Sequence, residues 1–397
     1  MCSLDEDFLV DSEHPTVQRI ITGLEEFQRI YTVFHRYASI FICVAGVLVN
    51  VVHILVLSRP RLRRCAVNAV LTAVAVCDVV IMTSYTIYLF RFRIFQTEGG
   101  YSYAWMVFLK SHVSVSVALH AITLYMGAAL AFIRWRALGN IQSRWLLPVT
   151  AWNMFFMVSV AIAVLTIPTF VLHHIYLVDS TETSTSIAEG MAGPSEGLYS
   201  LEFAHLPCAL YRFNLWIVAI VMKAAPCALL LWFTIALVLK LRATDEKRHH
   251  LYSKSFRKHI KKTTVPDRTT YMLLILLAVF LVTELPQGIL ALFNGMSTSY
   301  VYKSIYDNVG ELLDMLSLVN CSMDFILYCC MSSRYRQTFG HMLIRVESWV
   351  RNQWYPGKDG ERCARTIRRA HRVELTDDPS FSRVHCDGSC PPDAVDV

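Results

Sequence analysis

Seven long apolar segments constrain what this chain can fold into more than any other feature of its sequence. A helix needs about 20 predominantly apolar residues to cross the hydrocarbon core of a bilayer, and each segment reaches that length. Because lipid offers no hydrogen-bond partner to an exposed backbone group, a segment that crosses it has to be helical. The segments lie at residues 36–58, 67–90, 104–133, 145–172, 212–239, 269–293 and 307–331. The sequence therefore predicts an all-α membrane protein that forms a bundle of seven transmembrane helices.

Composition and the segments outside the seven helices complete the predicted organisation. Only 17% of the residues are charged, whereas soluble domains carry about 25%. The predicted parts are an N-terminal tail (1–35), the seven-transmembrane domain (36–332), an amphipathic membrane-surface helix (333–350) and a disordered tail (351–397). The surface helix is expected because apolar positions recur there at helical spacing with Arg and His between them. The last part is polar with mixed charge, which is typical of disorder.

Basic residues in the loops indicate the orientation in the membrane. Loop 58–66 carries four arginines and loop 240–268 carries ten Lys or Arg residues, whereas loop 173–212 has one arginine against five acidic residues. Since cytoplasmic loops carry the excess of Lys and Arg, we expect a multi-pass plasma-membrane protein with an extracellular N-terminus and a cytoplasmic C-terminal tail. The net charge of +6 reflects this one-sided distribution and suits an anionic inner leaflet. The lipid bilayer is thus an expected partner, and nucleic acid is not.

Polar residues and prolines stand at distinctive places in the apolar segments. They are Gly46 and Asn50 in the first segment, Asp78 in the second, Arg134 after the third, Trp152 in the fourth, Pro226 in the fifth, Pro286 in the sixth, and Asn320, Asp324 and Tyr328 in the seventh. Over about residues 36–345 this set resembles the rhodopsin-like (class A) G-protein-coupled receptors. The resemblance implies that Arg134 meets the G protein in the active state, that Pro286 kinks the sixth helix and that Tyr328 swings inward on activation.

Finer features resemble one group of these receptors. They are the stretch Glu284-Leu285-Pro286-Gln287-Gly288, the pair Asp324-Phe325, and the two histidines His112 and His120 of the third segment. Together they resemble invertebrate neuropeptide receptors of the myosuppressin and sex-peptide-receptor group. The resemblance implies a short amidated, FMRFamide-like peptide ending in Arg-Phe as the extracellular ligand. It also implies a heterotrimeric G protein, of the inhibitory type, as the cytoplasmic partner, with arrestin as a further candidate.

The sequence departs from the family pattern in two places. Ile133 precedes Arg134, so the acidic neighbour that usually restrains this arginine is absent. The usual disulfide cysteine near the outer end of the third helix is also missing, which leaves Cys208 of the second outer loop without its usual partner. Cys208 could pair with Cys2 or remain a thiol, and the sequence does not decide between the two.

Charged residues inside the predicted helices are the best indicators of a functional site, because a charge within the membrane costs a few kcal/mol unless it faces the bundle and finds a partner. By resemblance, a polar pocket that can hold an allosteric sodium ion is formed by Asp78, Thr123, Asn320 and Asp324, next to Asn50. Oxygen ligands suit a hard cation. A proton shared by two nearby carboxylates and a hydrogen-bonded network without an ion are the alternatives. No other cofactor is expected.

A second site involves Glu284 and Lys223, which the resemblance places inward at similar depth with His120 nearby. We hypothesise that they form a pair that helps to hold the inactive state. Removing one partner of such a buried pair would leave the other charge uncompensated. The alternative is that Lys223 extends toward the membrane interface or contacts a backbone carbonyl.

A third site is formed by Glu311 and Asp314, which lie three residues apart on one face of the seventh helix. An arginine in a peptide ligand needs a carboxylate partner, and charge-assisted contacts are the strong ones. We therefore expect Asp314 or Glu311 to bind the peptide arginine, with His112, His120, Glu284 and Lys223 as further ligand-binding residues. The alternative is that both acids stand at a solvated helix end.

Three classes of function remain to be weighed. The first is the peptide receptor described above, and the second is a related chemosensory receptor for an environmental small molecule. A transporter or channel is disfavoured because the helix number is odd and no internal repeat with broken helices is evident. Enzymatic activity is not expected, since no Cys/His metal spacing, phosphate-binding loop or serine nucleophile motif stands out.

Overall fold

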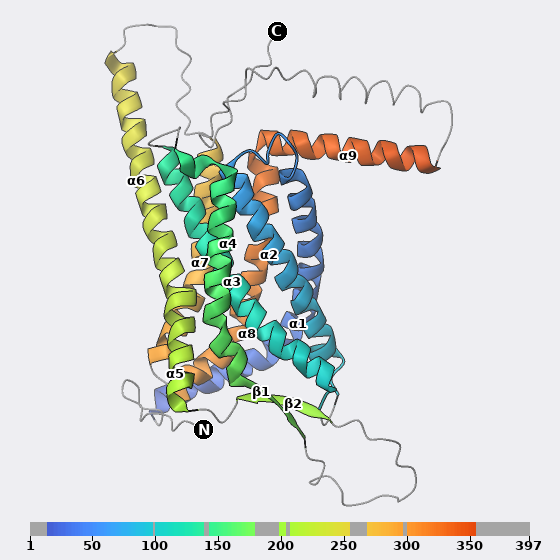
Figure 1. Cartoon of the computed structure of the whole chain (residues 1–397). Coiled ribbons are helices and arrows are strands. Elements are labelled where there is room, and N and C mark those ends of the chain that lie inside the picture. Colours follow the sequence, from blue (N-terminus) through green and yellow to red (C-terminus); the bar gives the residue numbers. More distant parts are fainter. Residues whose placement is uncertain are drawn as a thin grey trace, which may run out of the picture.

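The structure, a computed structural model, is nearly all helical (Figure 1). It describes residues 14–97, 100–138, 143–178, 198–203, 207–254, 268–296 and 300–354. The helices of the bundle are α1 (Pro15–Leu57), α2 (Ala66–Tyr88), α3 (Tyr103–Ala137), α4 (Pro148–Leu172), α5 (Cys208–Trp216), α6 (Ala225–Lys254), α7 (Arg268–Met296) and α8 (Tyr300–Met331). The remaining elements are η1 (Leu89–Ile94), η2 (Arg144–Leu146), β1 (His173–Leu177), β2 (Tyr199–Phe203), η4 (Ile217–Ala224) and α9 (Ser333–Trp354).

These elements make the predicted seven-helix bundle. Six of the described helices are long and apolar enough to cross a membrane, and α7 contributes a shorter apolar stretch at Leu277–Phe293. The fifth membrane helix is continuous through α5, η4 and α6, and the second continues from α2 into η1. The prediction of a multi-pass all-α bundle is therefore confirmed.

The two ends of the bundle carry different structures. At one end β1 pairs antiparallel with β2, and Tyr199 also exchanges two backbone hydrogen bonds of 3.0 and 2.8 Å with Tyr101 just before α3. At the other end α9 runs crosswise to the bundle (Figure 1). These are called the hairpin end and the α9 end below. The hairpin was not predicted, because its strands are short and lie in a loop identified only by its acidic residues.

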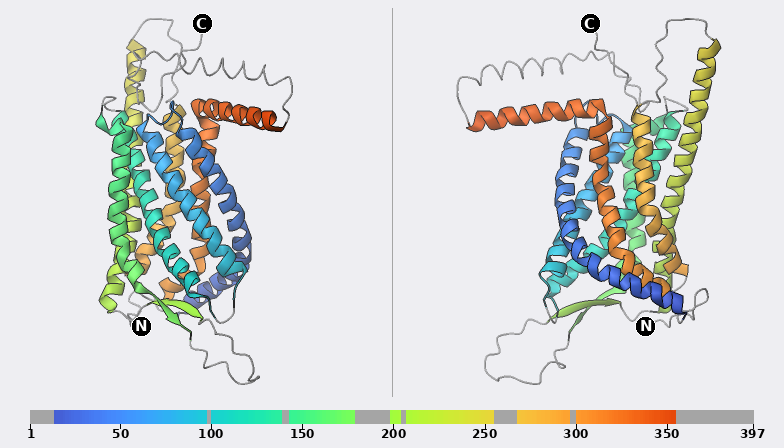
Figure 2. Two further views of the ribbon diagram at one scale, coloured as in Figure 1. Left: turned by 45° about the vertical axis from the view of Figure 1, so that its right-hand side comes forward. Right: turned by 180° about the vertical axis from the view of Figure 1, so that it is seen from behind.

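Helix α1 corrects the predicted N-terminal tail of residues 1–35. It begins at Pro15, where the Nδ1 atom of His14 accepts a hydrogen bond from the backbone N–H of Thr16. Its first part crosses the hairpin end before the helix turns along the bundle (Figure 2), and there Ile21 is buried and Gln28 donates to the backbone carbonyl of Asp307 in α8. The tail was extended too far because this part is amphipathic rather than uniformly apolar.

The predicted segment boundaries need one more correction, at the chain's other end. Helix α9 runs to Trp354, so the first residues of the predicted disordered tail (351–397) are helical. Exposed apolar side chains of α9 include Leu343, Ile344 and Trp349, in keeping with an amphipathic helix. The rest of that tail lies outside the described residues, as does Cys2.

Two of the membrane helices contain π-helical turns. One is η1, which follows α2, and the other is η4, which joins α5 to α6. A π-helical turn contains an extra residue and changes which side chains face the interior, and such turns are frequent at functional sites. Arg93 lies in η1 and Lys223 lies in η4. Each turn therefore helps to determine where a cationic side chain lies inside the bundle.

Close packing holds α1 against α2 and α8. Gly46 and Asn50 of α1 are buried, and the side-chain amide of Asn50 donates to the backbone carbonyls of Gly46 (3.0 Å) and of Cys321 in α8 (2.8 Å). A methyl group at Gly46 would overlap the side chain of Met82 and lie 2.9 Å from the hydroxyl of Ser322. The small residue thus allows the three helices to approach one another.

We predict that Gly46→Val lowers the thermal stability of the detergent-solubilised protein, because overpacking a well-packed core costs about 1–3 kcal/mol. The midpoint of thermal unfolding is the measurement. Gly23→Ala is the matched control in the same helix: no atom lies within 4 Å of the added methyl group there, and Ala favours a helix over Gly by about 1 kcal/mol. Equal stability of the Gly46 variant and the control would contradict this account of the packing.

Candidate functional site

Buried polar side chains extend through the interior of the bundle from the hairpin end to the α9 end. They fall into four groups, which contain most of the candidate site residues from the sequence. Since an unpaired charge or polar group is costly away from water, the partners of each group indicate what it can do.

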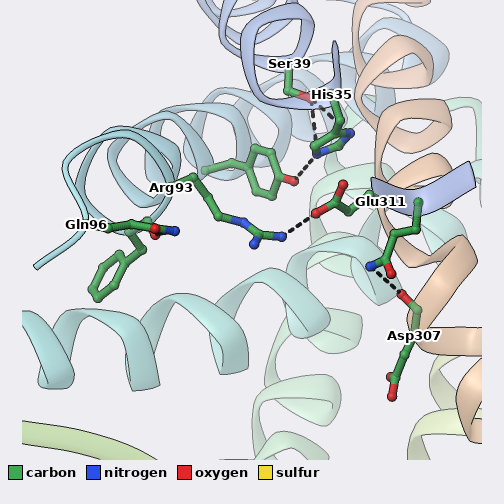
Figure 3. A network of polar contacts seen from close by, with 9 residues as sticks. His35, Ser39, Arg93, Gln96, Asp307 and Glu311 are labelled. Carbon is green, nitrogen blue, oxygen red and sulfur yellow. Dashed lines mark hydrogen bonds and ion pairs between the residues drawn. The ribbon is translucent and has the colours of Figure 1, made fainter. Parts of the chain in front are cut away.

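The first group lies at the hairpin end and joins α1, α2 with η1, and α8 (Figure 3). The guanidinium of Arg93 forms an ion pair with Oε1 of Glu311. Beside it, Nε2 of His35 lies 2.9 Å from the phenol oxygen of Tyr85, and the hydroxyl of Ser39 lies 3.3 Å from the same ring nitrogen. Glu311 is only 9% exposed, so this carboxylate does not stand at a solvated helix end.

Asp314 lies one turn further along α8 and is partly buried. It interacts electrostatically with Lys223, Glu311, Arg93 and Glu284. It also interacts electrostatically with the phenol groups of Tyr31, Tyr85 and Tyr88. Asp314 is therefore central to the polar interior, between the first group and the second.

The two histidines of α3 occupy different surroundings. His112 is buried in a stack of rings, with its centroid 5.4 Å from that of Tyr88 and 5.9 Å from that of Phe108. Its Nδ1 atom makes no hydrogen bond with the described residues. His120, two turns further along α3, interacts electrostatically with Lys223 and Glu284. The structure thus brings all six predicted ligand-binding residues into one connected interior region.

The second group joins η4 to α7 and α8 around Glu284, which is 3% exposed. The amine of Lys223 lies 3.8 Å from Oε2 of Glu284, and it donates a shorter hydrogen bond of 2.5 Å to Oε1 of Gln287. The hydroxyl of Ser317 donates to Oε1 of Glu284 at 3.0 Å. The amine of Lys223 is therefore directed into the bundle, not toward the membrane interface. Pro286, between the two acceptors in sequence, lies inside α7.

Sequence reasoning did not identify Gln287 and Ser317 as members of this group. A signal for Gln287 was present, because it follows Glu284 by three residues and side chains at this spacing share a helical face. Ser317 gave no such signal, since its partner is on another helix.

The third group lies midway along the bundle, between α1, α2, α3 and α8. Asp78 is buried, accepts a hydrogen bond from the thiol of Cys321 and senses the charge of Asp324. Buried oxygens without a hydrogen-bond partner among the described residues are Oδ1 of Asn50, Oδ1 of Asn320 and both carboxylate oxygens of Asp324. The hydroxyl of Thr123 donates to the backbone of its own helix, at His120.

These oxygens fit a hard cation better than a transition metal. Carboxylate and amide oxygens are the ligands that hard cations prefer, and four such buried atoms in this group lack a hydrogen-bond partner among the described residues. No cluster of three or more His, Cys, Asp or Glu side chains in the described part of the chain is placed to hold a metal ion. Water is the other group that could satisfy these oxygens.

The fourth group, at the α9 end, surrounds Arg134. This arginine is 5% exposed and interacts electrostatically with Tyr328 of α8, while the preceding residue, Ile133, is fully buried in the core. The amine of Lys240 in α6 donates to the backbone carbonyl of Trp135 at 2.8 Å and lies 4.7 Å above the Trp135 ring. Helix α3 is therefore fastened to α6 through the residue next to Arg134.

Helix α9 is attached at the same end through a cluster of rings. Nδ1 of His53 in α1 lies 2.9 Å from the phenol oxygen of Tyr335, and Tyr328 packs against both rings. Burial raises the pKa of Tyr335, so its phenol remains protonated at neutral pH. A movement of Tyr328 would therefore change its ring contacts with both α1 and α9.

Cys208, the first residue of α5, is disulfide-bonded. Cys2, the candidate partner from the sequence, lies outside the described residues.

We predict that Lys223 and Glu284 are energetically coupled. Lys223→Met and Glu284→Gln should each lower the thermal stability of the purified protein, since removing one partner of a buried pair costs about 3–5 kcal/mol. The double variant should be more stable than the sum of the two single changes implies. Thermal unfolding of the three variants in detergent is the measurement.

Lys110 provides the matched control, because its amine lies 4.2 Å above the ring of Phe170 and contacts no carboxylate among the residues that the structure describes. Lys110→Met combined with Glu284→Gln should be additive. If the Lys223 pair is additive as well, the two residues are not coupled.

Comparison with known proteins gives three matches. The sequence model of the serpentine-type seven-transmembrane G-protein-coupled chemoreceptors named Srw matches residues 37–346, from α1 to α9. The G-protein coupled receptor dmsr-1 of Caenorhabditis elegans is 32% identical over 362 residues, which covers 79% of this chain and 69% of that protein. The sex peptide receptor of Drosophila melanogaster is 29% identical over 122 residues, which covers 30% of this chain and 28% of that protein.

Proposed function

Because this chain belongs to the family of serpentine seven-transmembrane G-protein-coupled receptors and is therefore a receptor, not an enzyme, we propose that it detects a short amidated peptide outside the cell. The peptide we favour is FMRFamide-like and ends in Arg-Phe. The observation that carries this proposal is the set of acidic side chains at and below the hairpin end: Glu311 and Glu284 are buried, and the partly buried Asp314 interacts electrostatically with both. A cationic peptide needs such partners.

Two further observations support a peptide ligand within this family. One relative is named a receptor for the sex peptide. The stretch around Glu284 and the pair Asp324-Phe325 resemble the rhodopsin-like peptide receptors of the myosuppressin and sex-peptide-receptor group. Within this proposal, His112 and His120 contribute to the ligand cavity, and the contact of Lys223 with Glu284 and Gln287 stabilises the inactive arrangement.

The orientation follows from the same proposal. The hairpin end, with the N-terminal residues, faces the cell exterior, and the α9 end faces the cytoplasm of a cell whose plasma membrane the protein spans. Loop 58–66, with its four arginines, lies between α1 and α2 at the α9 end. This agrees with the excess of basic residues in cytoplasmic loops.

At the cytoplasmic end Arg134 and Tyr328 are the residues we assign to G-protein coupling, with an inhibitory G protein as the preferred partner and arrestin as a further one. A ligand that binds one of two bundle arrangements better shifts the population toward it by its difference in affinity. Pro286 lies two residues from Glu284 and gives α7 a point of bending. The ring cluster around Tyr328 and the Lys240–Trp135 contact are the connections that such a shift would have to rearrange.

A second candidate function is a chemosensory receptor for an environmental small molecule. The observation that favours it is the description of the matching family, whose members are named chemoreceptors. The acidic interior would then bind a small cation. The two candidates differ in whether a peptide of several residues is needed for activation.

We predict that amidated Arg-Phe peptides activate this receptor in a cell-based signalling screen. The response should disappear in Arg134→Ala, which is the coupling control, although surface expression is retained. A peptide in which citrulline replaces the arginine should lose at least about tenfold in potency, because the charge-assisted contact contributes about 1.5–3 kcal/mol. Silence toward all peptides with confirmed surface expression would favour the chemosensory function.

We also propose that the oxygens of Asp78, Asn320 and Asp324, with Asn50 and Thr123 adjacent, hold an allosteric sodium ion. The proposal is supported by the buried oxygens of this group that have no hydrogen-bond partner in the described part of the chain. A bound sodium ion would neutralise part of the negative charge of the two aspartates.

If this assignment holds, replacing N-methylglucamine chloride with sodium chloride at constant ionic strength raises the midpoint of thermal unfolding of the purified receptor. Ligand that binds only the folded state adds about 1.4 kcal/mol at a concentration near ten times its Kd. Asp324→Asn should abolish the effect of sodium, whereas Glu202→Gln, an exposed acid in β2, should preserve it. A sodium effect that survives Asp324→Asn would place the ion elsewhere.

A further inference from the structure

The ion pair between Arg93 and Glu311 has an asymmetry that bears on its role. The carboxylate side chain of Glu311 is 10% exposed, whereas the side chain of Arg93 is 34% exposed. The guanidinium reaches Glu311 from η1, across the hairpin end (Figure 3). Because the arginine is long, flexible and partly solvated, it can leave the carboxylate for water at much lower cost than the carboxylate can leave the interior.

Hydrogen-bonding atoms around Glu311 remain available beyond the one that Arg93 contacts. Oε2 of Glu311 and the phenol oxygen of Tyr31 are both buried without a hydrogen-bond partner among the described residues. Asp314 and Glu284 are two further acidic side chains in this region. Asp314 interacts electrostatically with the cations Arg93 and Lys223. A guanidinium can form two parallel hydrogen bonds with a carboxylate, and Arg93 is bound to Oε1.

Within the described part of the chain, the other arginine of the same π-helical turn forms no ion pair with an acidic side chain. The guanidinium of Arg91 lies 4.7 Å from the ring centroid of Tyr101 and 5.5 Å from that of Trp105, and it donates to the backbone carbonyl of Phe95. Two arginines two residues apart thus have different partners, one aromatic and one acidic. Arg91 is therefore a matched control for charge and location.

We propose that Arg93 is an internal substitute for the guanidinium of the ligand. It neutralises Glu311 while the receptor is empty, and the ligand guanidinium displaces it when the ligand binds. The proposal rests on the proposed function in one respect, namely that the ligand carries an arginine. The new element is that the ligand arginine must displace Arg93. It then binds in what we call the guanidinium seat, which is formed by Glu311 with the phenol of Tyr31 beside it.

This substitution has a consequence for selectivity. A ligand without a cationic group would have to leave Glu311 paired with Arg93 and gain nothing from the seat. A guanidinium ligand competes with Arg93. Its apparent affinity is therefore its intrinsic affinity multiplied by the fraction of receptors in which Arg93 does not occupy the seat. Removing Arg93 should therefore increase the affinity for guanidinium compounds instead of reducing it.

The test uses ethylguanidinium as the probe and the purified full-length receptor in detergent. Arg93→Ala should lower the midpoint of thermal unfolding, and millimolar ethylguanidinium should restore it. The wild-type receptor, Arg91→Ala and the double variant Arg93→Ala/Glu311→Gln should gain no comparable stability. Ethylammonium at the same concentration controls for charge without the planar fork of a guanidinium.

Failure of ethylguanidinium to stabilise Arg93→Ala, or equal stabilisation of Arg91→Ala, would overturn the proposal. If Arg93→Ala cannot be recovered in folded form, Arg93→Lys replaces it, because lysine keeps the charge but lacks the planar, forked guanidinium. Ethylguanidinium should then stabilise Arg93→Lys more than the wild type, and equal stabilisation would again overturn the proposal.

A second experiment, with a peptide, distinguishes failure of this proposal from failure of the proposed function. An amidated Arg-Phe peptide should be about tenfold more potent on Arg93→Ala than on the wild type if Arg93 occupies the seat in about nine of ten empty receptors. A fall in potency would overturn the substitution and make Arg93 a direct ligand contact. If no peptide acts on either form while ethylguanidinium still rescues Arg93→Ala, the peptide assignment fails and the guanidinium seat stands.

Discussion

A charged side chain inside a membrane bundle has to find a partner, and this requirement connects the helices of this protein to one another. Arg93 and Glu311 join the end of the second membrane helix to α8, and Lys223 joins the fifth to α7 through Glu284 and Gln287. Each contact links elements that are distant in sequence. Because losing one partner leaves a buried charge uncompensated, the helices cannot move apart at these points without a replacement partner.

The π-helical turns explain how two of these contacts are possible. Arg93 and Lys223 each lie in such a turn, where the extra residue changes the direction in which the following side chains point. An ideal helix would place these side chains on other faces. A ligand that competes for one of these carboxylates would act on the turn as well as on the ion pair, which gives the interior a route by which binding can alter helix packing.

Much of the fold could be predicted because lipid restricts the choice to helices, so hydropathy alone located the seven segments. The family resemblance placed Lys223 and Glu284 inward at similar depth, and the cost of an unpaired charge in the membrane then suggested that they form a pair. The first part of α1 was missed because it is amphipathic and lies across the hairpin end. The spacing of Gln287 from Glu284 was a usable sequence signal, whereas the partner of Glu311 could be identified only once the position of η1 was known. Hydropathy carries no information on a π-helical turn, and for this reason the Arg93 contact could not be foreseen.

The length of α1 has a consequence for how the protein sits in the bilayer. Its 43 residues correspond to about 65 Å of helix, roughly twice the thickness of the hydrocarbon core. The first part carries exposed apolar side chains, among them Ile20, Ile30 and Phe34, which suit a helix embedded at the membrane surface. Membrane thickness should therefore set the angle between the two parts of α1. Because His35 of α1 lies within hydrogen-bond distance of Tyr85, a change in this angle caused by lipid composition would reach Tyr85 and its neighbours.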